Sequence, residues 1–409
     1  MNLWLTVSGL LLGLGLGYVR DEPAPLDWLM IPLTLGTLLY HFFAPHRKPI
    51  LLPATLLALF LVLHLPAFLY GSIQDFGRAI RYGSITGYLA SFWYIGRILG
   101  DRESFRQGLL AGIFLALVAN LLAGLLEYFG FLHFDPSTWR FGERLQGFYK
   151  DPNVLGPFAI FAGCVAAFVF RRPRHILLRN VALGVATLTV ILTFSRGAWV
   201  NLAVTLGASL ILLWRRTRSI TLLASTAITL LGVVWLMLLW NPSWLEFAKS
   251  RLGMMAYDEA RFYFQIEGLR TGWATFWGIG PGQSERVLEY ATHSLFVRVW
   301  AEQGPLGMLV LSAFLLLHVY ALLQALRRAQ TAQDILARGA LLACLLGTLA
   351  NSFFIDTLHW RHFWLLLGLT WAYAYSLPDY EGGAWRRTSS RARPVAKLPS
   401  EGGAAPLHR

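Results

Sequence analysis

The sequence predicts an all-α, polytopic membrane protein with about twelve transmembrane helices, and two observations carry this prediction. Hydrophobic residues make up 56% of the 409 residues and charged residues only 14%, whereas a soluble domain carries about 25% charged residues. The apolar residues also fall into long runs separated by short basic loops. The net charge of +13 therefore reflects membrane topology, and we expect no nucleic-acid partner.

A transmembrane helix needs about 20 apolar residues, or about 17 at the short end. The apolar runs lie approximately at 3–18, 28–43, 50–70, 84–99, 108–129, 154–170, 181–195, 199–214, 220–240, 304–325, 336–354 and 363–378. The first run has no basic segment before it and is expected to be a retained helix. The seventh and eighth runs touch, which predicts a tight turn between Ser195 and Trp199.

The loops on one side of the predicted helices hold most of the Lys and Arg residues, including the purely basic loops at 171–174 and 215–218. The positive-inside rule places that side, and both termini, in the cytoplasm. We expect one transmembrane domain over 1–378 and a disordered, basic cytoplasmic tail over 379–409 that is attracted to lipid.

The opposite, outer side has three long segments, and the longest is 241–303. Trp, Phe and Tyr residues alternate there with Arg and Glu, which is typical of an amphipathic domain lying in the membrane interface. Six arginines break the positive-inside pattern on this side: Arg78, Arg81, Arg140, Arg144, Arg196 and Arg261. Clustered arginine on a membrane face points to phosphate binding.

Arg196 lies in the tight turn, next to Gly197. A guanidinium at this point needs a partner or a water-filled cavity. It is either an interfacial arginine paired with a headgroup or a carboxylate, or an anion ligand at the mouth of a cavity. Arg261 has similar alternatives, because Asp258 and Glu259 precede it and offer local ion pairs.

The glycine-rich run Gly278-Ile279-Gly280-Pro281-Gly282 follows Arg261. It lacks the lysine of a nucleotide-binding loop and is predicted to form a tight turn. His293 then lies where the chain re-enters the membrane. It is either structural or a general base, since a neutral imidazole takes a proton from a hydroxyl. Glu302, nine residues later, orients His293 only if the intervening helix is kinked.

The remaining outer arginines come in pairs. Arg140 and Arg144 have helical spacing and are predicted to face one anion together, and the same argument applies to Arg78 and Arg81. We treat these four, with Glu302, as secondary site residues.

Asp151 followed by Pro152 is typical of a helix start. His359 and His362 have i, i+3 spacing, but no carboxylate accompanies them in a metal-binding pattern. The two cysteines, Cys164 and Cys344, lie in apolar runs without metal or redox spacing. The residues therefore predict no metal and no cofactor.

Taken in order, several motifs resemble the O-antigen ligase and O-antigen polymerase superfamily. They are Asp151-Pro152-Asn153, Ser195-Arg196-Gly197-Ala198, Arg261 with the glycine-rich run, His293-Ser294, and Glu302-x-Gly304-x-x-Gly307. The resemblance implies a GT-C type membrane glycosyltransferase in the bacterial inner membrane, with its active site facing the periplasm or the cell exterior. Its donor is a glycan on undecaprenyl pyrophosphate, transferred with inversion to a sugar hydroxyl.

By position, Arg196 and Arg261 match the family arginines that bind the pyrophosphate, and His293 matches the family base. Ser294 departs from the asparagine common at that point of the family. The short segment between Arg261 and His293 favours a polymerase of lipid-linked repeats over a ligase that transfers the glycan to lipid A core. A polymerase implies a flippase and a chain-length regulator as partners. A transporter or flippase of lipid-linked glycan is the alternative from another class, since it also uses arginines in a cavity.

Overall fold

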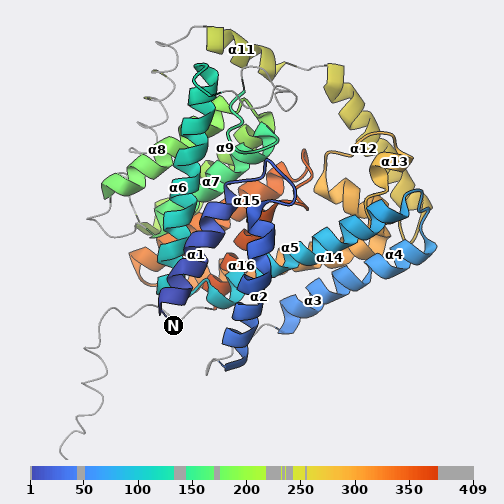
Figure 1. The fold of residues 1–409 in the computed structure, drawn as a ribbon, viewed down its shortest axis with the longest axis horizontal. Coiled ribbons are helices and arrows are strands. Elements are labelled where there is room, and N and C mark those ends of the chain that lie inside the picture. Colours follow the sequence, from blue (N-terminus) through green and yellow to red (C-terminus); the bar gives the residue numbers. More distant parts are fainter. Residues whose placement is uncertain are drawn as a thin grey trace, which may run out of the picture. The chain divides into compact units, whose positions relative to one another are not determined.

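A computed structural model describes residues 2–43, 51–132, 144–169, 176–217, 243–253 and 256–375, with single positions at 232 and 235. Within these ranges the elements are helices, and the only pairing of extended backbone is an isolated bridge between Val19 and Tyr149. The predicted all-α class is therefore confirmed for the described part of the chain (Figure 1).

The helices are, in chain order, α1 (Asn2–Leu16), α2 (Pro25–Phe43), α3 (Leu51–Val62), α4 (His64–Tyr70), α5 (Phe76–Leu99), α6 (Glu103–Tyr128), α7 (Pro152–Val169), α8 (Ile176–Leu192), α9 (Arg196–Thr217), α11 (Ser243–Leu252), α12 (Ala256–Ala274), α13 (Ser284–Val287), α14 (Leu295–Arg328), α15 (Ala332–Asn351) and α16 (Arg361–Ala374).

Six helical segments are long and apolar enough to cross a bilayer, namely Pro25–Phe43, Leu51–Tyr70, Glu103–Tyr128, Arg196–Leu213, Leu295–Arg328 and Ala332–Asn351. Shorter apolar helices, including α1, accompany them. The predicted run at 220–240 lies almost wholly outside the described residues, as does the tail, and each of the other predicted runs coincides with a helix. The total of twelve spans and the cytoplasmic placement of the termini stay predictions.

Two helices begin eight and nine residues earlier than the apolar runs indicated, because polar residues cap them. The Asp75 carboxylate accepts a hydrogen bond from the Arg78 backbone N–H (2.9 Å), so α5 begins at Phe76 instead of 84. Ser294 likewise accepts from the backbone N–H of Val297, so α14 begins at Leu295 instead of 304. The polar first turns of both helices thus extend them beyond the apolar runs, into the predicted outer segments 71–83 and 241–303.

α1 and α6 pack against each other with their backbones in contact. Gly9 and Gly13 on α1 face Gly108 and Gly112 on α6, each pair four residues apart. A Cβ on Gly112 would lie 2.3 Å from the carbonyl oxygen of Leu10. Paired small residues at this spacing bring membrane helices close enough for van der Waals contact along the backbone.

Replacing Gly112 by leucine is expected to destabilise the protein by about 1–3 kcal/mol or more, because the side chain overpacks a backbone contact. The melting temperature of the purified protein in detergent measures this. Gly207→Leu on α9 is the matched control, since no atom lies within 4 Å of a Cβ built there. Equal melting temperatures for the two variants would contradict the close packing.

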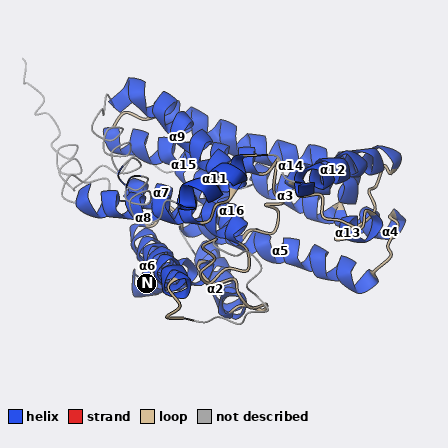
Figure 2. Cartoon of the chain, turned by 90° about the horizontal axis from the view of Figure 1, so that it is seen from above, coloured by secondary structure: helices blue, strands red, loops and turns tan. Residues whose placement is uncertain are grey.

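Four helix pairings position the functional residues. α9 packs along α15, α7 packs on α8 and α15, and α12 packs on α14. Figure 2 shows α9 and α15 lying side by side, with α12 against α14. α9 begins at the predicted site residue Arg196, and His293 lies in the short turn before α14.

Candidate active site

The turn between α8 and α9 is as tight as predicted. α8 ends at Leu192 and α9 begins at Arg196, and Phe194 between them has a left-handed φ of 45°. A bulky residue with positive φ is strained, and such strain is found mostly where the surrounding structure fixes a functional residue. The buried Ser195 hydroxyl donates to Asn153 Oδ1 (2.8 Å), which ties the turn to the start of α7.

The predicted helix start at Asp151 is confirmed. α7 begins at Pro152, and the Asp151 carboxylate accepts from the Asn153 backbone N–H (2.8 Å). Asn153 Oδ1 also accepts from Arg144 (2.8 Å), whose Nε donates to the Thr193 carbonyl (2.8 Å). Arg144 is thus anchored beside the α8–α9 turn. Burial lowers the pKa of Arg144 to about 10, which leaves it charged at pH 7.

A cavity of about 470 Å³ lies beside this turn, and we call it the cationic cavity. Four arginines line it: Arg144, Arg196, Arg251 and Arg261. Asp258 is the acidic residue among its lining residues. The cavity therefore presents an excess of positive charge, as an anion-binding site requires.

The ring of Tyr257 brings three of these arginines together. The guanidinium carbons of Arg196, Arg261 and Arg251 lie 5.4, 5.0 and 5.8 Å from the ring centroid. Arg196 also donates to the Tyr257 hydroxyl (3.0 Å). Cation–π attraction offsets part of the repulsion among the like charges, so the tyrosine serves as the scaffold of the cluster.

Asp258 pairs with Arg196 through both oxygens, including a contact of 2.8 Å between Nη1 and Oδ2. Arg196 is therefore paired with a carboxylate, which is the first of the two alternatives predicted for it, and this ion pair lies inside the cavity. The local ion pair considered for Arg261 is not observed. Within the described ranges, Arg251 and Arg261 have no carboxylate within salt-bridge distance, and the buried Nε of each lacks a hydrogen-bond partner.

His293 lies at the edge of the cationic cavity. Its ring packs on Tyr290, which lines the cavity, with centroids 5.4 Å apart. Gln265, another lining residue, donates to the His293 carbonyl (3.4 Å). The backbone of His293 has a left-handed φ of 47°, which is strained for a residue other than glycine.

The environment keeps the His293 imidazole neutral. Burial, and after it the charge of Arg261, lowers the pKa of His293 to about 4. At pH 7 the ring is therefore unprotonated and able to accept a proton. Arg261 thus belongs both to the cationic cavity and to the surroundings of the histidine.

The glycine-rich segment forms the tight turn that was predicted. Gly278, Gly280 and Gly282 all have positive φ, and a Cβ on Gly278 would lie 2.4 Å from the Glu302 carbonyl oxygen. The Glu302 carboxylate accepts from the Gly282 N–H (2.8 Å) and the Ser284 hydroxyl (2.6 Å). Its contacts hold this turn on α14 instead of orienting His293, and the kink in α14 lies beyond it, at Gly304.

Arg298 is a buried residue of this region that sequence reasoning missed. It forms ion pairs with Asp356 (2.5 Å), Glu302 (3.2 Å) and Glu285 (3.5 Å). It therefore joins α14 to α13 and to the loop before α16. Although burial alone would raise it, the pKa of Asp356 is held well below its usual range by Arg298 and His359. The signal available in the sequence was an arginine four residues before Glu302.

Arg78 and Arg81 do not join the cationic cavity. Arg78 pairs with Glu285 and donates to the Gly282 carbonyl (2.6 Å), and Arg81 pairs with Glu22 (3.3 Å). Each arginine thus has its own carboxylate, and the expectation that the pair faces one anion stays a prediction. Arg140 lies outside the described residues.

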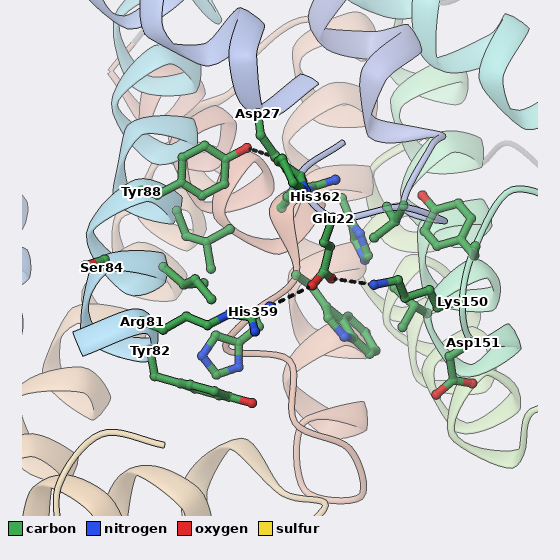
Figure 3. A pocket seen from close by; sticks show the side chains of 18 of the residues that line it. Glu22, Asp27, Arg81, Tyr82, Ser84, Tyr88, Lys150, Asp151, His359 and His362 are labelled. Carbon is green, nitrogen blue, oxygen red and sulfur yellow. Dashed lines mark hydrogen bonds and ion pairs between the residues drawn. The ribbon is translucent and has the colours of Figure 1, made fainter. Parts of the chain in front are cut away.

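Arg78 and Arg81 instead line a larger cavity of about 1280 Å³, shown in Figure 3. We call it the mixed-charge cavity. In the described part of the chain no group of three or more His, Cys, Asp or Glu residues is placed to hold a metal ion. The expected independence from metal stays a prediction.

The apolar helices define a helical membrane protein, in which an arginine-lined cavity lies beside a histidine whose imidazole is neutral at pH 7. Residues 181–312 match the family model of Wzy_C, described as O-antigen ligase. The chain therefore carries a domain of the O-antigen ligase family, and the resemblance seen in the motifs is confirmed over these residues. A search of curated proteins found no match.

Members of this family are membrane enzymes that transfer lipid-linked glycans. The matched residues include Arg196, Arg261 and His293, whereas Arg78, Arg81 and Arg144 precede them. The domain thus covers the α8–α9 turn, α12, the glycine-rich turn and the first half of α14.

Proposed function

We propose that the protein transfers a glycan from undecaprenyl pyrophosphate to a sugar hydroxyl, with inversion, and that it polymerises lipid-linked repeat units. The observation that carries the proposal is the position of a neutral histidine beside two guanidiniums that have no carboxylate partner in the described structure. We place this site at the outer face of the bacterial inner membrane.

In this mechanism the cationic cavity binds the pyrophosphate of the donor. Arg251 and Arg261 supply the charges that no carboxylate of the described ranges neutralises, and Asp258 holds Arg196 beside them. The leaving pyrophosphate gains negative charge as the glycosidic C–O bond breaks. Guanidiniums fixed before the reaction stabilise that charge in the transition state without reorganisation.

His293 acts as the general base. The acceptor hydroxyl oxygen attacks the anomeric carbon, its proton passes to the imidazole, and the bonding electrons leave with the pyrophosphate. Attack on the face opposite the leaving group inverts the anomeric centre. The low pKa of His293 keeps the base available at pH 7.

α12 suits a position in the membrane interface. Tyr257, Asp258 and Arg261 line the cationic cavity, whereas Ile266, Leu269 and Trp273 are exposed. A helix with a polar face toward its protein and apolar side chains exposed beside it lies readily at the headgroup boundary. This position keeps the polyprenyl chain of the donor in the bilayer while its pyrophosphate reaches the arginines.

The segment from Arg261 to His293 supports polymerisation. The structure describes all of it, as the rest of α12, the glycine-rich turn, the short helix α13 and a five-residue connection to His293. This segment contains no additional domain to hold a bulky lipid acceptor. An acceptor that is itself a lipid-linked repeat needs only a glycan-sized site next to the donor.

The test is to incubate the purified protein in detergent with lipid-linked repeat alone, without an ion gradient. A ladder of products is expected. If product forms only after lipid A core is added, the protein is a ligase and not a polymerase. No product under either condition, together with movement of the lipid across reconstituted vesicles, would replace the enzyme by a transporter.

A further inference from the structure

We propose that the mixed-charge cavity binds the acceptor glycan and that the two substrates therefore occupy separate cavities. The inference rests on the proposed function. In Figure 3 the side chains of this cavity come from the α1–α2 connection, α2, α5, the segment before α7, the loop before α16 and the start of α16. None of its lining residues is among the predicted pyrophosphate ligands Arg196 and Arg261.

The charges of the mixed-charge cavity are balanced. Its lining contains four acidic and four basic residues, namely Glu22, Asp27, Asp75, Asp151, Arg78, Arg81, Lys150 and Arg361. Many of them are paired: Glu22 accepts from Arg81 and Lys150 (3.3 Å each), and Asp27 pairs with Arg361 (2.7 Å). Such a lining has much less excess positive charge to attract a pyrophosphate than the cationic cavity has. It suits an uncharged ligand.

The same lining has the groups that recognise sugars. Carboxylates accept hydrogen bonds from hydroxyls, and arginine and lysine donate to them. Tyr82, Tyr88 and Trp360 add aromatic surface with polar tips, which suits the C–H faces of a sugar ring. A ligand with many hydroxyl groups and no charge fits this combination of groups best.

The mixed-charge and cationic cavities border the same two segments of the chain. At the start of α7, Asp151 lines the mixed-charge cavity and Asn153 lines the cationic one. In the loop before α16, Ile355 lines the cationic cavity and His359 the mixed-charge one. An acceptor in the mixed-charge cavity thus has a short path to a donor held by the arginines.

Asp356 lies between those two loop residues, bonds to Arg298 (2.5 Å) and to His359 (3.2 Å), and is close enough to raise the pKa of His293. The base is therefore adjacent to the segment that separates the cavities. This is where a hydroxyl entering from the acceptor side has to lose its proton.

Ser84→Trp tests the assignment by filling the mixed-charge cavity from α5, where the exposed Ser84 lines it (Figure 3). The donor is lipid-linked glycan extracted from the source membranes. The acceptor probe is the free glycan released from the same extract by mild acid and labelled at its reducing end. The variant is expected to raise the KM for the free glycan at least about tenfold, a loss of about 1.4 kcal/mol, with unchanged binding of undecaprenyl pyrophosphate.

Ile80→Trp is the matched control, because Ile80 is exposed on the same helix and does not line the cavity. Lys150→Gln provides a second variant if Ser84→Trp fails to fold. It replaces the charged ammonium donor of Lys150 by a shorter, neutral amide. Within the described ranges the ionic partner of Lys150 is the half-exposed Glu22. It is expected to raise the acceptor KM while the KM for the donor stays constant.

The outcomes separate the two proposals. A wild-type protein that elongates no labelled glycan contradicts the proposed function. An active wild type whose acceptor KM is the same in Ser84→Trp and Lys150→Gln overturns the acceptor site alone. A rise in the donor KM in both variants, with the acceptor KM unchanged, would assign the cavity to the donor glycan. This result would also overturn the acceptor site.

Discussion

Replacing His293 by alanine is expected to lower kcat for glycan transfer by about 10²–10⁴-fold, the usual contribution of a general base. Binding of undecaprenyl pyrophosphate and the amount of protein in the membrane should stay near wild type. His293→Asn is the companion variant, because asparagine tolerates the left-handed backbone at this position better than alanine does. His41→Ala, outside both cavities, is the control.

The pH profile gives an independent readout of the same role. A base works only when unprotonated, so kcat/KM falls as the pH drops through the pKa of the free enzyme's base. Burial and the charge of Arg261 place that pKa at about 4. The acid limb of the wild-type profile is thus expected near pH 4. An acid limb at the ordinary histidine value, about 6.5, would contradict a buried base at this position.

Arg261→Gln is expected to lower kcat/KM by about 10²–10³-fold, the range measured when one transition-state donor is removed from a preorganised site. The guanidinium has no carboxylate partner within the described ranges, so its charge is available to the pyrophosphate. Its loss should also shift the acid limb to higher pH, because Arg261 helps to lower the pKa of His293.

Arg270→Gln is the matched control for this variant. Arg270 lies on the same helix, is exposed and pairs with Glu267 (2.6 Å) outside the cationic cavity. Its removal should leave kcat/KM within about twofold of wild type, as for most exposed ion pairs. Equal activity in Arg261→Gln and Arg270→Gln would remove Arg261 from the site.

The sequence was most informative where a physical pattern is local. Apolar runs located most of the long helices, and the contact between two runs predicted the turn at Arg196. Hydropathy could not detect the capped polar turns at Asp75 and Ser294. Arg298, within the outer segment 241–303, was not distinguished from the other basic residues there, and its ion pair with Asp356 was missed.

The composition of the candidate site depends on contacts between distant segments. The predicted topology placed all six outer arginines on one side of the membrane and so grouped them. Two of them have carboxylate partners far along the chain: Arg81 pairs with Glu22, and Arg78 pairs with Glu285. Arg251 was not distinguished from other basic residues. Its place in the cationic cavity is apparent only once it, Arg196 and Arg261 surround Tyr257.

The central claim is that a pyrophosphate held by arginines leaves as His293 deprotonates the acceptor. The most direct measurement counts undecaprenyl pyrophosphate by mass spectrometry against new glycosidic bonds, using purified protein, lipid-linked glycan and a metal chelator. Equal amounts of the two products are expected for the wild type, and both products are expected to form about 10²–10⁴-fold more slowly with His293→Asn. Undecaprenyl monophosphate as the released lipid, or bond formation at the wild-type rate by His293→Asn, would contradict this claim.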